Sequence, residues 1–222
     1  MQQWMTLTTA LGPVRTWQAF PTAPARGGVV LLQEIFGVTA HIRRVADGYA
    51  ADGYAVLAPA LFDPVQPGAE LPCDAAGMTQ GRHLAAQLGF DGAVRIVQAA
   101  SHWLREAGHR VAAIGYCWGG SVAYLANTRL GLPAVSYYGA RTVPFLPEPL
   151  QAPMLFHFGQ DDALIPPEDI QRHRLAHPDA AVHVYPGGHA FNRDDDPVHF
   201  HEASAELARQ RALSFLAEYL HD

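Results

Sequence analysis

The sequence has few of the features that mark nucleic-acid-binding, membrane and secreted disulfide-rich proteins. Charged residues make up only 16% of its 222 residues, the formal net charge is −6, and no basic cluster offers a footprint for phosphates. The longest apolar runs, such as 29–32, have the length of a strand and are too short to span a membrane. There are two cysteines, and the first residues lack the basic and apolar regions of a signal peptide. We therefore predict a cytoplasmic protein with free thiols, no nucleic-acid partner and no membrane partner.

What the chain does contain is a series of short apolar segments that alternate with helical patterns. A β-hairpin is predicted first, with strands 4–9 and 14–20 on either side of a Gly-Pro turn. The later predicted strands are 29–33, 54–58, 110–114, 133–138, 153–158 and 182–185. The predicted helices are 41–52, 83–107 with a break near Gly89 and Gly92, 121–127, a helix that begins near Pro167, and 200–220. Residues 59–80 are rich in Pro, Gly and Asp and are predicted to form a long loop. This alternation predicts an α/β fold in one domain, 1–222, with a mostly parallel, doubly wound sheet and helices on both faces.

The most informative motif lies between the predicted strand 110–114 and the predicted helix 121–127. It reads Gly115-Tyr116-Cys117-Trp118-Gly119-Gly120. A Gly-x-nucleophile-x-Gly turn between a strand and a helix is the nucleophile elbow of α/β-hydrolases, and its glycines prevent collisions around a strained residue. Cys117 occupies the nucleophile position. Most free cysteines are buried as small hydrophobic residues, but a helix N-terminus favours the thiolate, so we interpret Cys117 as a nucleophile.

A carboxylate that orients a histidine base should follow the nucleophile in the chain. The predicted strand 153–158 runs into Asp161 and Asp162. We favour Asp162 as the acid, because it completes a Gly-x-x-Asp sequence four residues before Pro166. The alternative is that both aspartates cap the helix near Pro167, a role that stays open for Asp161.

The base is predicted to be His189, which follows strand 182–185 and the glycines Gly187 and Gly188. Glycines at the end of a strand suit a loop that presents an imidazole ring. The other histidines considered have helical, turn or polar surroundings and are predicted to lie at the surface: His83, His102, His109, His177, His199 and His201. There is no His-Glu-x-x-His or Cys-x-x-Cys sequence, so we expect no metal and no cofactor. Cys73 has no activating neighbours in the sequence and is expected to be an ordinary thiol.

Four motifs in order resemble the dienelactone hydrolase family over nearly the whole chain. They are Gln33-Glu34-Ile35-Phe36-Gly37, the elbow at 115–120, Gly159-x-x-Asp162 and Gly188-His189-Ala190-Phe191. The resemblance implies an α/β-hydrolase fold. It also implies hydrolysis of a dienelactone-type cyclic enol ester to an open-chain keto acid such as maleylacetate, through an acyl-enzyme, in the degradation of aromatic compounds.

The resemblance also assigns roles to residues of the site. Cys117, Asp162 and His189 would form a triad, and Glu34 would switch the thiol between resting and reactive forms. The backbone N–H groups of Ile35 and Trp118 would form the oxyanion hole, which agrees with the general geometry of such sites.

Recognition of the substrate is expected to depend on its carboxylate. The resemblance points to Arg193 as the residue that binds this group, although Asp194, Asp195 and Asp196 follow at once and are expected to compete for it. Arg82, Phe36 and Tyr138 are the other predicted substrate-binding residues, and Trp118 replaces a smaller residue and is expected to reshape the pocket.

The expected partner is therefore a small ester or lactone substrate that carries a carboxylate, and the protein is expected to be a monomer. Two alternatives stay open, a general carboxylesterase for small acyl groups and a non-catalytic thiol-based binding or redox module.

Overall fold

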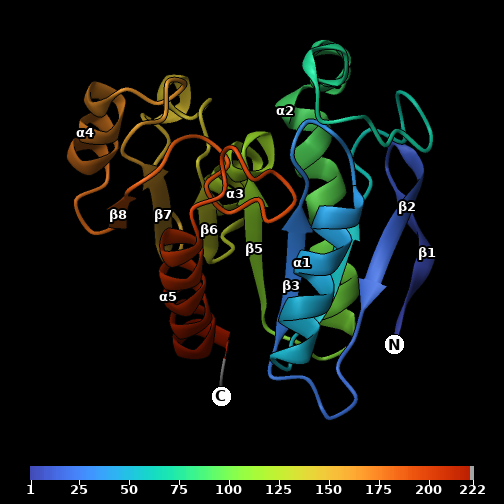
Figure 1. Cartoon of the computed structure of the whole chain (residues 1–222). Coiled ribbons are helices and arrows are strands. Elements are labelled where there is room, and N and C mark those ends of the chain that lie inside the picture. The colour runs from blue at the N-terminus through green and yellow to red at the C-terminus, as the bar shows by residue number, and fades with distance from the viewer. Residues whose placement is uncertain (221–222) are drawn as a thin grey trace.

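A computed structural model describes residues 1–220 of the chain and shows an eight-stranded sheet in the order β1-β2-β4-β3-β5-β6-β7-β8 (Figure 1). The strands are β1 Gln2–Thr9, β2 Gly12–Ala19, β3 Gly28–Leu32, β4 Ala55–Pro59, β5 Val111–Tyr116, β6 Ala134–Tyr137, β7 Met154–Gly159 and β8 Ala181–Tyr185. The predicted hairpin forms β1 and β2, and β2 pairs antiparallel with β4. All further pairs are parallel, as predicted from the alternation of strands and helices.

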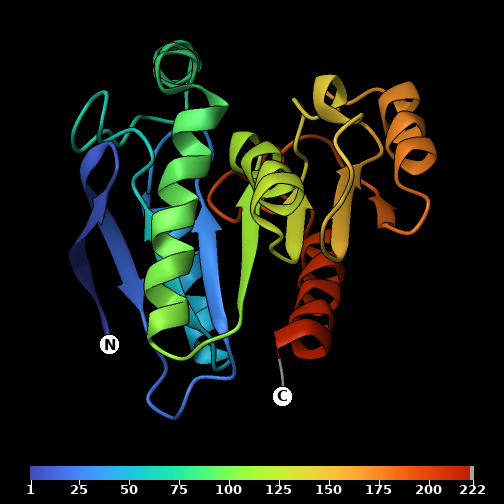
Figure 2. The same ribbon diagram turned by 180° about the vertical axis from the view of Figure 1, so that it is seen from behind.

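The helices cover both faces of this sheet. They are α1 Ala40–Ala51, α2 Ala75–Glu106, α3 Trp118–Leu130, α4 Pro167–Ala176 and α5 Glu202–Leu220, with a short 3-10 helix at Val143–Phe145. Helices α1 and α5 lie on the face that Figure 1 presents, and α2 and α3 lie on the face that Figure 2 presents. The inner strands β3, β4, β5, β6 and β7 are buried along their whole length, as expected for strands that are covered on both faces.

One boundary differs from the sequence prediction in a way that affects the site. The segment 75–80 was predicted to be loop, but it is the first turn of α2, capped by the Asp74 side chain on the N–H of Gly77. The glycines that suggested a loop allow close packing instead: a Cβ on Gly77 would lie 1.9 Å from the Pro72 carbonyl oxygen, and one on Gly81 would lie 2.1 Å from that of Ile35. The predicted break in α2 occurs at Gly89, where φ is 68°.

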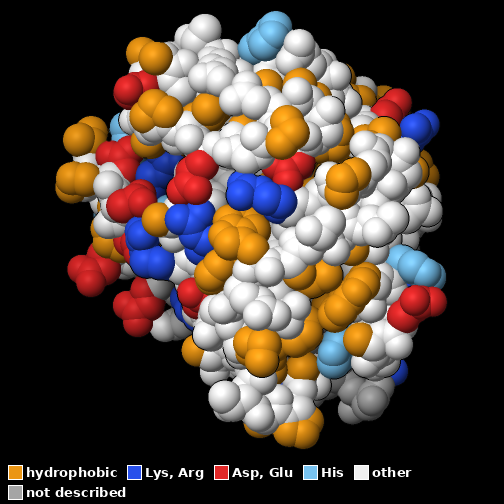
Figure 3. Space-filling model, turned by 90° about the vertical axis from the view of Figure 1, so that its right-hand side faces the viewer, with side chains coloured by type: hydrophobic (Ala, Val, Ile, Leu, Met, Phe, Trp, Pro, Cys, Tyr) orange, Lys and Arg blue, Asp and Glu red, His pale blue; other side chains and the backbone are white. Residues whose placement is uncertain are grey.

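Figure 3 shows the distribution of charged side chains on one face of the molecule. On the face shown in Figure 3, arginines lie among acidic side chains and do not form a separate basic patch. Among residues 1–220, no helix combines the length and the hydropathy needed to cross a membrane.

Candidate active site

The elbow forms where β5 ends and α3 begins. Cys117 has φ 54° and ψ −118°, a conformation that is strained for a residue with a side chain. A Cβ on Gly115 would lie 1.9 Å from the carbonyl oxygen of Gly119, and one on Gly119 would lie 2.4 Å from that of Gln33. Both glycines are thus needed for the close approach of β5, α3 and the end of β3. The thiol of Cys117 lies at the N-terminus of α3, where the helix dipole favours a negative charge.

The structure brings the three predicted triad residues together. His189 Nε2 lies 3.0 Å from Cys117 Sγ, and His189 Nδ1 lies 2.8 Å from Asp162 Oδ2. The parallel strands β5, β7 and β8 end at the same edge of the sheet, and the three residues follow those ends (Figure 1). With Nδ1–H donating to Asp162, Nε2 is left to exchange a proton with the thiol. This is the arrangement that a histidine base needs for nucleophilic catalysis.

The two candidate aspartates have different surroundings. The Asp162 side chain is fully buried, and its second oxygen accepts a hydrogen bond from the N–H of Leu164 at 2.8 Å. Asp161 is exposed, and its backbone N–H donates to the Gly187 carbonyl oxygen. The expectation that Asp161 caps α4 is wrong, since the N-cap is Pro166 and no side chain bonds there.

Charge on both sides of the imidazole favours the protonated form. Burial alone lowers the pKa of His189, but the adjacent Cys117 thiolate and the Asp162 carboxylate outweigh burial and raise the pKa to about 10. The raised pKa lets His189 hold a proton next to Cys117 Sγ.

The two predicted oxyanion donors lie close to the elbow. Trp118 is the first residue of α3, where a backbone N–H has no acceptor within the helix. Ile35 follows β3, and a Cβ on Gly119 would touch the backbone of that strand end at Leu32 and Gln33. Within the described part of the chain, neither the N–H of Ile35 nor that of Trp118 has a hydrogen-bond acceptor.

Glu34 is buried, and its partner is Arg193. The Arg193 guanidinium donates through Nη2 to Glu34 Oε2 and through Nη1 to Cys73 Sγ, and it lies 4.8 Å from the centre of the Phe36 ring. Arg193 is itself only 5% exposed. Cys73 has no activating neighbour along the chain, but in the folded structure its thiol contacts the Arg193 guanidinium. Burial raises the pKa of Cys73 and Arg193 opposes that effect, so the net direction is upward.

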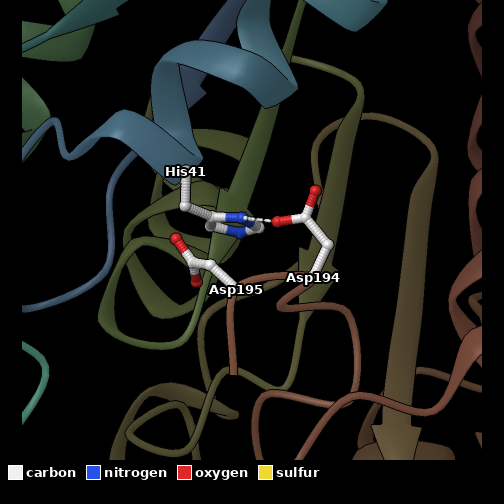
Figure 4. A group of neighbouring side chains, drawn as sticks. All are labelled: His41, Asp194 and Asp195. Atoms are coloured by element: carbon white, nitrogen blue, oxygen red, sulfur yellow. Dashed lines mark hydrogen bonds and ion pairs between the residues drawn. The ribbon is translucent and has the colours of Figure 1, made fainter. Parts of the chain in front are cut away.

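The aspartates after Arg193 are held by other cations. Asp194 lies 2.9 Å from His41 Nδ1 and 2.8 Å from Arg44 Nη2, and Figure 4 shows Asp195 on the other side of the His41 ring. The ligand atoms of His41, Asp194 and Asp195 lie within 4.8 Å of one another, a spacing that suits a metal ion. However, Arg44 Nη2 already contacts one oxygen of each carboxylate, so both acids have a cationic partner in the protein itself.

Tyr138 and Arg82, both predicted to bind substrate, have different surroundings. Tyr138 is fully buried with φ 40°, and its ring lies 5.0 Å from that of His189. Its hydroxyl has no partner among the side chains that the structure describes. Arg82 is exposed on α2, next to the Gly81 that packs against Ile35. Trp118 lies between the rings of Phe62 and Phe90 at 5.4 and 6.0 Å, so an aromatic wall extends from the elbow.

One histidine outside the triad lies in the interior, contrary to the sequence prediction. His177 was predicted to lie at the surface, but it is buried and bonds Tyr124 Oη at 2.9 Å.

A cavity of about 400 Å³ lies between α1 and α5, and its walls include His41, Arg44 and Asp194 but none of the three triad residues.

Comparisons with known proteins show which proteins the chain is similar to. A family model described as the dienelactone hydrolase family matches residues 14–220. A carboxymethylenebutenolidase of Pseudomonas putida is 32% identical over 217 residues, which cover 91% of this chain and 91% of that protein. A Salmonella typhimurium protein assigned the same activity is 34% identical over 215 residues, covering 86% of this chain and 77% of its own. A crystal structure from Klebsiella pneumoniae, of a protein assigned as a dienelactone hydrolase, has a TM-score of 0.86 and 27% identity, and the match covers 99% of each chain.

Proposed function

The chain belongs to the dienelactone hydrolase family and is a hydrolase of esters or lactones, and we propose that it cleaves its substrate through a Cys117 acyl-enzyme. The observation that carries the proposal is the continuous contact from Asp162 through His189 to Cys117 Sγ, with 2.8 and 3.0 Å between the bonded atoms. Family membership sets aside the non-catalytic alternative.

The first half of the proposed reaction forms a thioester. Cys117 Sγ bonds to the acyl carbon, and the negative charge that develops on the carbonyl oxygen is stabilised by the N–H groups of Ile35 and Trp118. When the tetrahedral intermediate collapses, the bond from the acyl carbon to the ring oxygen breaks. The proton held at His189 Nε2 goes to the departing enolate oxygen, and the resulting enol rearranges to the ketone. In a lactone the leaving group stays tethered to the acyl chain.

The second half releases the acid. His189 Nε2 accepts a proton from water, the hydroxide bonds to the acyl carbon, and the carbon–sulfur bond breaks. The thiolate of Cys117 and the imidazolium of His189 are then restored. Asp162 keeps the Nδ1–H tautomer throughout, which leaves Nε2 as the exchanging atom.

Substrate recognition is proposed to use the Glu34–Arg193 pair. A carboxylate on the substrate competes with Glu34 for the guanidinium, in a pocket where Phe36 supports Arg193 and Tyr138 offers an unpaired hydroxyl. Burial raises the pKa of Tyr138 well above its usual range, and the charges of Glu34 and Cys117 raise it further, which places both groups near this hydroxyl. Release of Glu34 from Arg193 is proposed to link substrate binding to the switching of Cys117 between its resting and reactive forms.

A small-acyl carboxylesterase is the second candidate, and the burial of Arg193 favours it. A guanidinium that is 5% exposed and already paired is a less accessible anchor for a substrate carboxylate than a free one. In both readings the enzyme is proposed to act as a monomer in the cytoplasm, on a small molecule, with no metal or cofactor in the reaction.

The acyl-enzyme is tested by trapping. We expect the His189→Gln variant to accumulate one acyl group on Cys117 when it is mixed with p-nitrophenyl acetate, as seen by intact mass and peptide mapping. Cys117→Ala should show no acyl adduct, and Cys73→Ser is the matched control that should behave as wild type in both assays. Acylation at another residue, or full turnover by Cys117→Ala, would contradict the proposal.

The substrate class is tested by kcat/KM. Comparing dienelactone isomers with p-nitrophenyl acetate separates the two candidates, since only a carboxylate-bearing lactone benefits from Arg193. We expect Arg193→Gln to raise KM for the lactones by a factor of roughly 10–100, the equivalent of about 1.5–3 kcal/mol for hydrogen bonds to a charged group. Equal effects on lactone and neutral ester would favour the carboxylesterase.

A further inference from the structure

The sequence places three aspartates directly after Arg193, and an unscreened neighbour of opposite charge is the expected partner of a guanidinium. The structure shows a different pairing, in which Arg193 bonds Glu34, 159 residues away in the chain. The adjacent carboxylates contribute only one long contact, between Asp195 Oδ1 and Arg193 Nε at 3.9 Å.

Each of these carboxylates has another partner. Arg44 Nη2 donates to Asp194 Oδ1 at 2.8 Å and to Asp195 Oδ2 at 3.1 Å. Asp196 Oδ2 lies 2.7 Å from His199 Nδ1. Arg44 thus holds two of the three acids, and it does so from α1, an element that does not carry the triad.

Asp195 is the acid within reach of Arg193. Its Oδ1 lies 3.9 Å from Arg193 Nε, while its Oδ2 is bonded to Arg44. The Asp195 side chain is 46% exposed, so it is free to rotate if its bond to Arg44 is lost. Asp194 is less free, because the buried His41 also bonds it.

We propose that Arg44 is a positioning residue that limits Asp195 to one long contact with Arg193, at 3.9 Å, which leaves the Nη atoms of the guanidinium to Glu34 and to the carboxylate of the substrate. The claim that a substrate carboxylate binds Arg193 rests on the proposed function. The claim that Arg44 controls the contact between Arg193 and Asp195 does not rest on it, and a separate measurement tests this claim.

That readout is the reactivity of Cys73, an exposed thiol that accepts a hydrogen bond from Arg193 Nη1. The Arg193 charge favours the Cys73 thiolate, against the effect of burial. If Arg193 turns toward Asp195, Cys73 loses this support and reacts more slowly with iodoacetamide, because the thiolate is the reactive form. Peptide mapping separates Cys73 from Cys117.

The experiment compares Arg44→Gln, Asp195→Asn and the double variant at one fixed pH. We expect Arg44→Gln to slow alkylation of Cys73 about threefold, which corresponds to a pKa rise of about half a unit. The double variant should return to the wild-type rate, since the competing carboxylate has been removed. Arg193→Gln gives the rate with no guanidinium at all. Arg172→Gln is the matched control, an exposed arginine that pairs with an aspartate on α4, and it should change nothing.

The same variants are then assayed with substrate. KM for a carboxylate-bearing lactone should rise roughly tenfold in Arg44→Gln relative to the change for p-nitrophenyl acetate, about the value of one charge-assisted hydrogen bond. It should recover in the double variant, and Arg44→Lys should retain most of the wild-type behaviour.

The outcomes separate the two ideas. Slower alkylation that Asp195→Asn rescues, with no change in KM for the lactone, supports the positioning role and overturns recognition of the carboxylate by Arg193. An unchanged Cys73 rate in Arg44→Gln overturns the positioning role. A slower rate that Asp195→Asn does not rescue overturns it too, because Arg44 would then act only through the stability of the loop.

Discussion

The buried Glu34–Arg193 pair makes a quantitative prediction about stability. Both side chains are almost fully enclosed, at 3% and 6% exposure, and they lie on segments that follow β3 and β8. Removing one partner leaves the other charge buried without compensation, which costs about 3–5 kcal/mol in measured cases. We therefore expect Arg193→Gln to lower the free energy of unfolding by about that amount, a decrease in Tm of roughly 6–20 °C for a chain of this size.

Glu34→Gln should have a smaller effect than Arg193→Gln. Arg193 keeps its contacts with Cys73 and with the Phe36 ring when Glu34 is neutralised, whereas Glu34 has no other cation at hydrogen-bond distance among residues 1–220. The double variant Glu34→Gln/Arg193→Gln removes both charges, so it should be more stable than Arg193→Gln alone. The difference in this cycle measures the coupling between the two groups.

Urea unfolding followed by circular dichroism measures these values, with the slope m checked for constancy. Arg172→Gln is the reference for an exposed pair, which contributes about 0–1 kcal/mol. A loss below about 1 kcal/mol in Arg193→Gln, or a double variant no more stable than it, would refute the argument that burial makes the pair matter.

The remaining predictions concern the thiols, the elbow and pH. Iodoacetamide should label Cys117 much faster than Cys73, because only Cys117 has an imidazole at 3.0 Å and a helix N-terminus; peptide mapping decides this. Gly119→Ala should abolish activity and strongly lower Tm, since its Cβ would lie 2.4 Å from a backbone oxygen. Burial lowers the pKa of His157 well below 6.5, so stability should fall as pH drops through 6.5, and His157→Gln should reduce that slope. The raised pKa of His189 has the opposite sign: its contribution is complete below pH 6.5 and is lost as pH rises through about 10, which a Tm–pH series of wild type and His189→Gln measures.

The fold could be predicted because the relevant signals are local. A strand that is covered on both faces is an apolar run, and Gly28–Leu32 and Val111–Tyr116 show this directly. The one large error in boundaries, at 75–80, arose because glycine is ambiguous. Gly77 belongs to the segment whose composition indicates a loop, yet Gly77 and the following Gly81 allow close packing of a helix on two carbonyl groups, which only the folded chain reveals.

The arrangement of Cys117, Asp162 and His189 could be predicted for a related reason. Each of them follows a predicted strand directly, and parallel strands end at one edge, so their order in the chain was enough to bring them together. Their catalytic roles stay proposals that the acylation experiment tests. The choice of Asp162 over Asp161 has a structural counterpart, since only Asp162 is buried and bonded to the imidazole.

The pairing around Arg193 could not be read from the sequence, because proximity along the chain was the wrong guide. The turn at 190–200 is held by hydrogen bonds such as Arg193 N–H to the Ala190 carbonyl oxygen, and Asp194 and Asp195 meet α1 at Arg44. Arg193 meets the end of β3 instead.

Burial explains why the Arg193 guanidinium pairs with Glu34 and not mainly with the aspartates that follow it in the chain. Glu34 is buried after an apolar strand, where an unpaired charge costs much free energy, whereas the exposed aspartates Asp194 and Asp195 are solvated and gain little from pairing with Arg193. Glu34 is the carboxylate for which an unpaired charge would cost the most free energy, and it therefore pairs with Arg193 although it lies far away in the sequence. The same reasoning explains why the arginine of α1 matters in the proposed positioning role. Arg44 pairs with the solvated aspartates, which bind Arg193 more weakly than Glu34 does. Only a carboxylate that is buried next to Arg193, such as that of the proposed substrate, can then bind the guanidinium as strongly as Glu34 does.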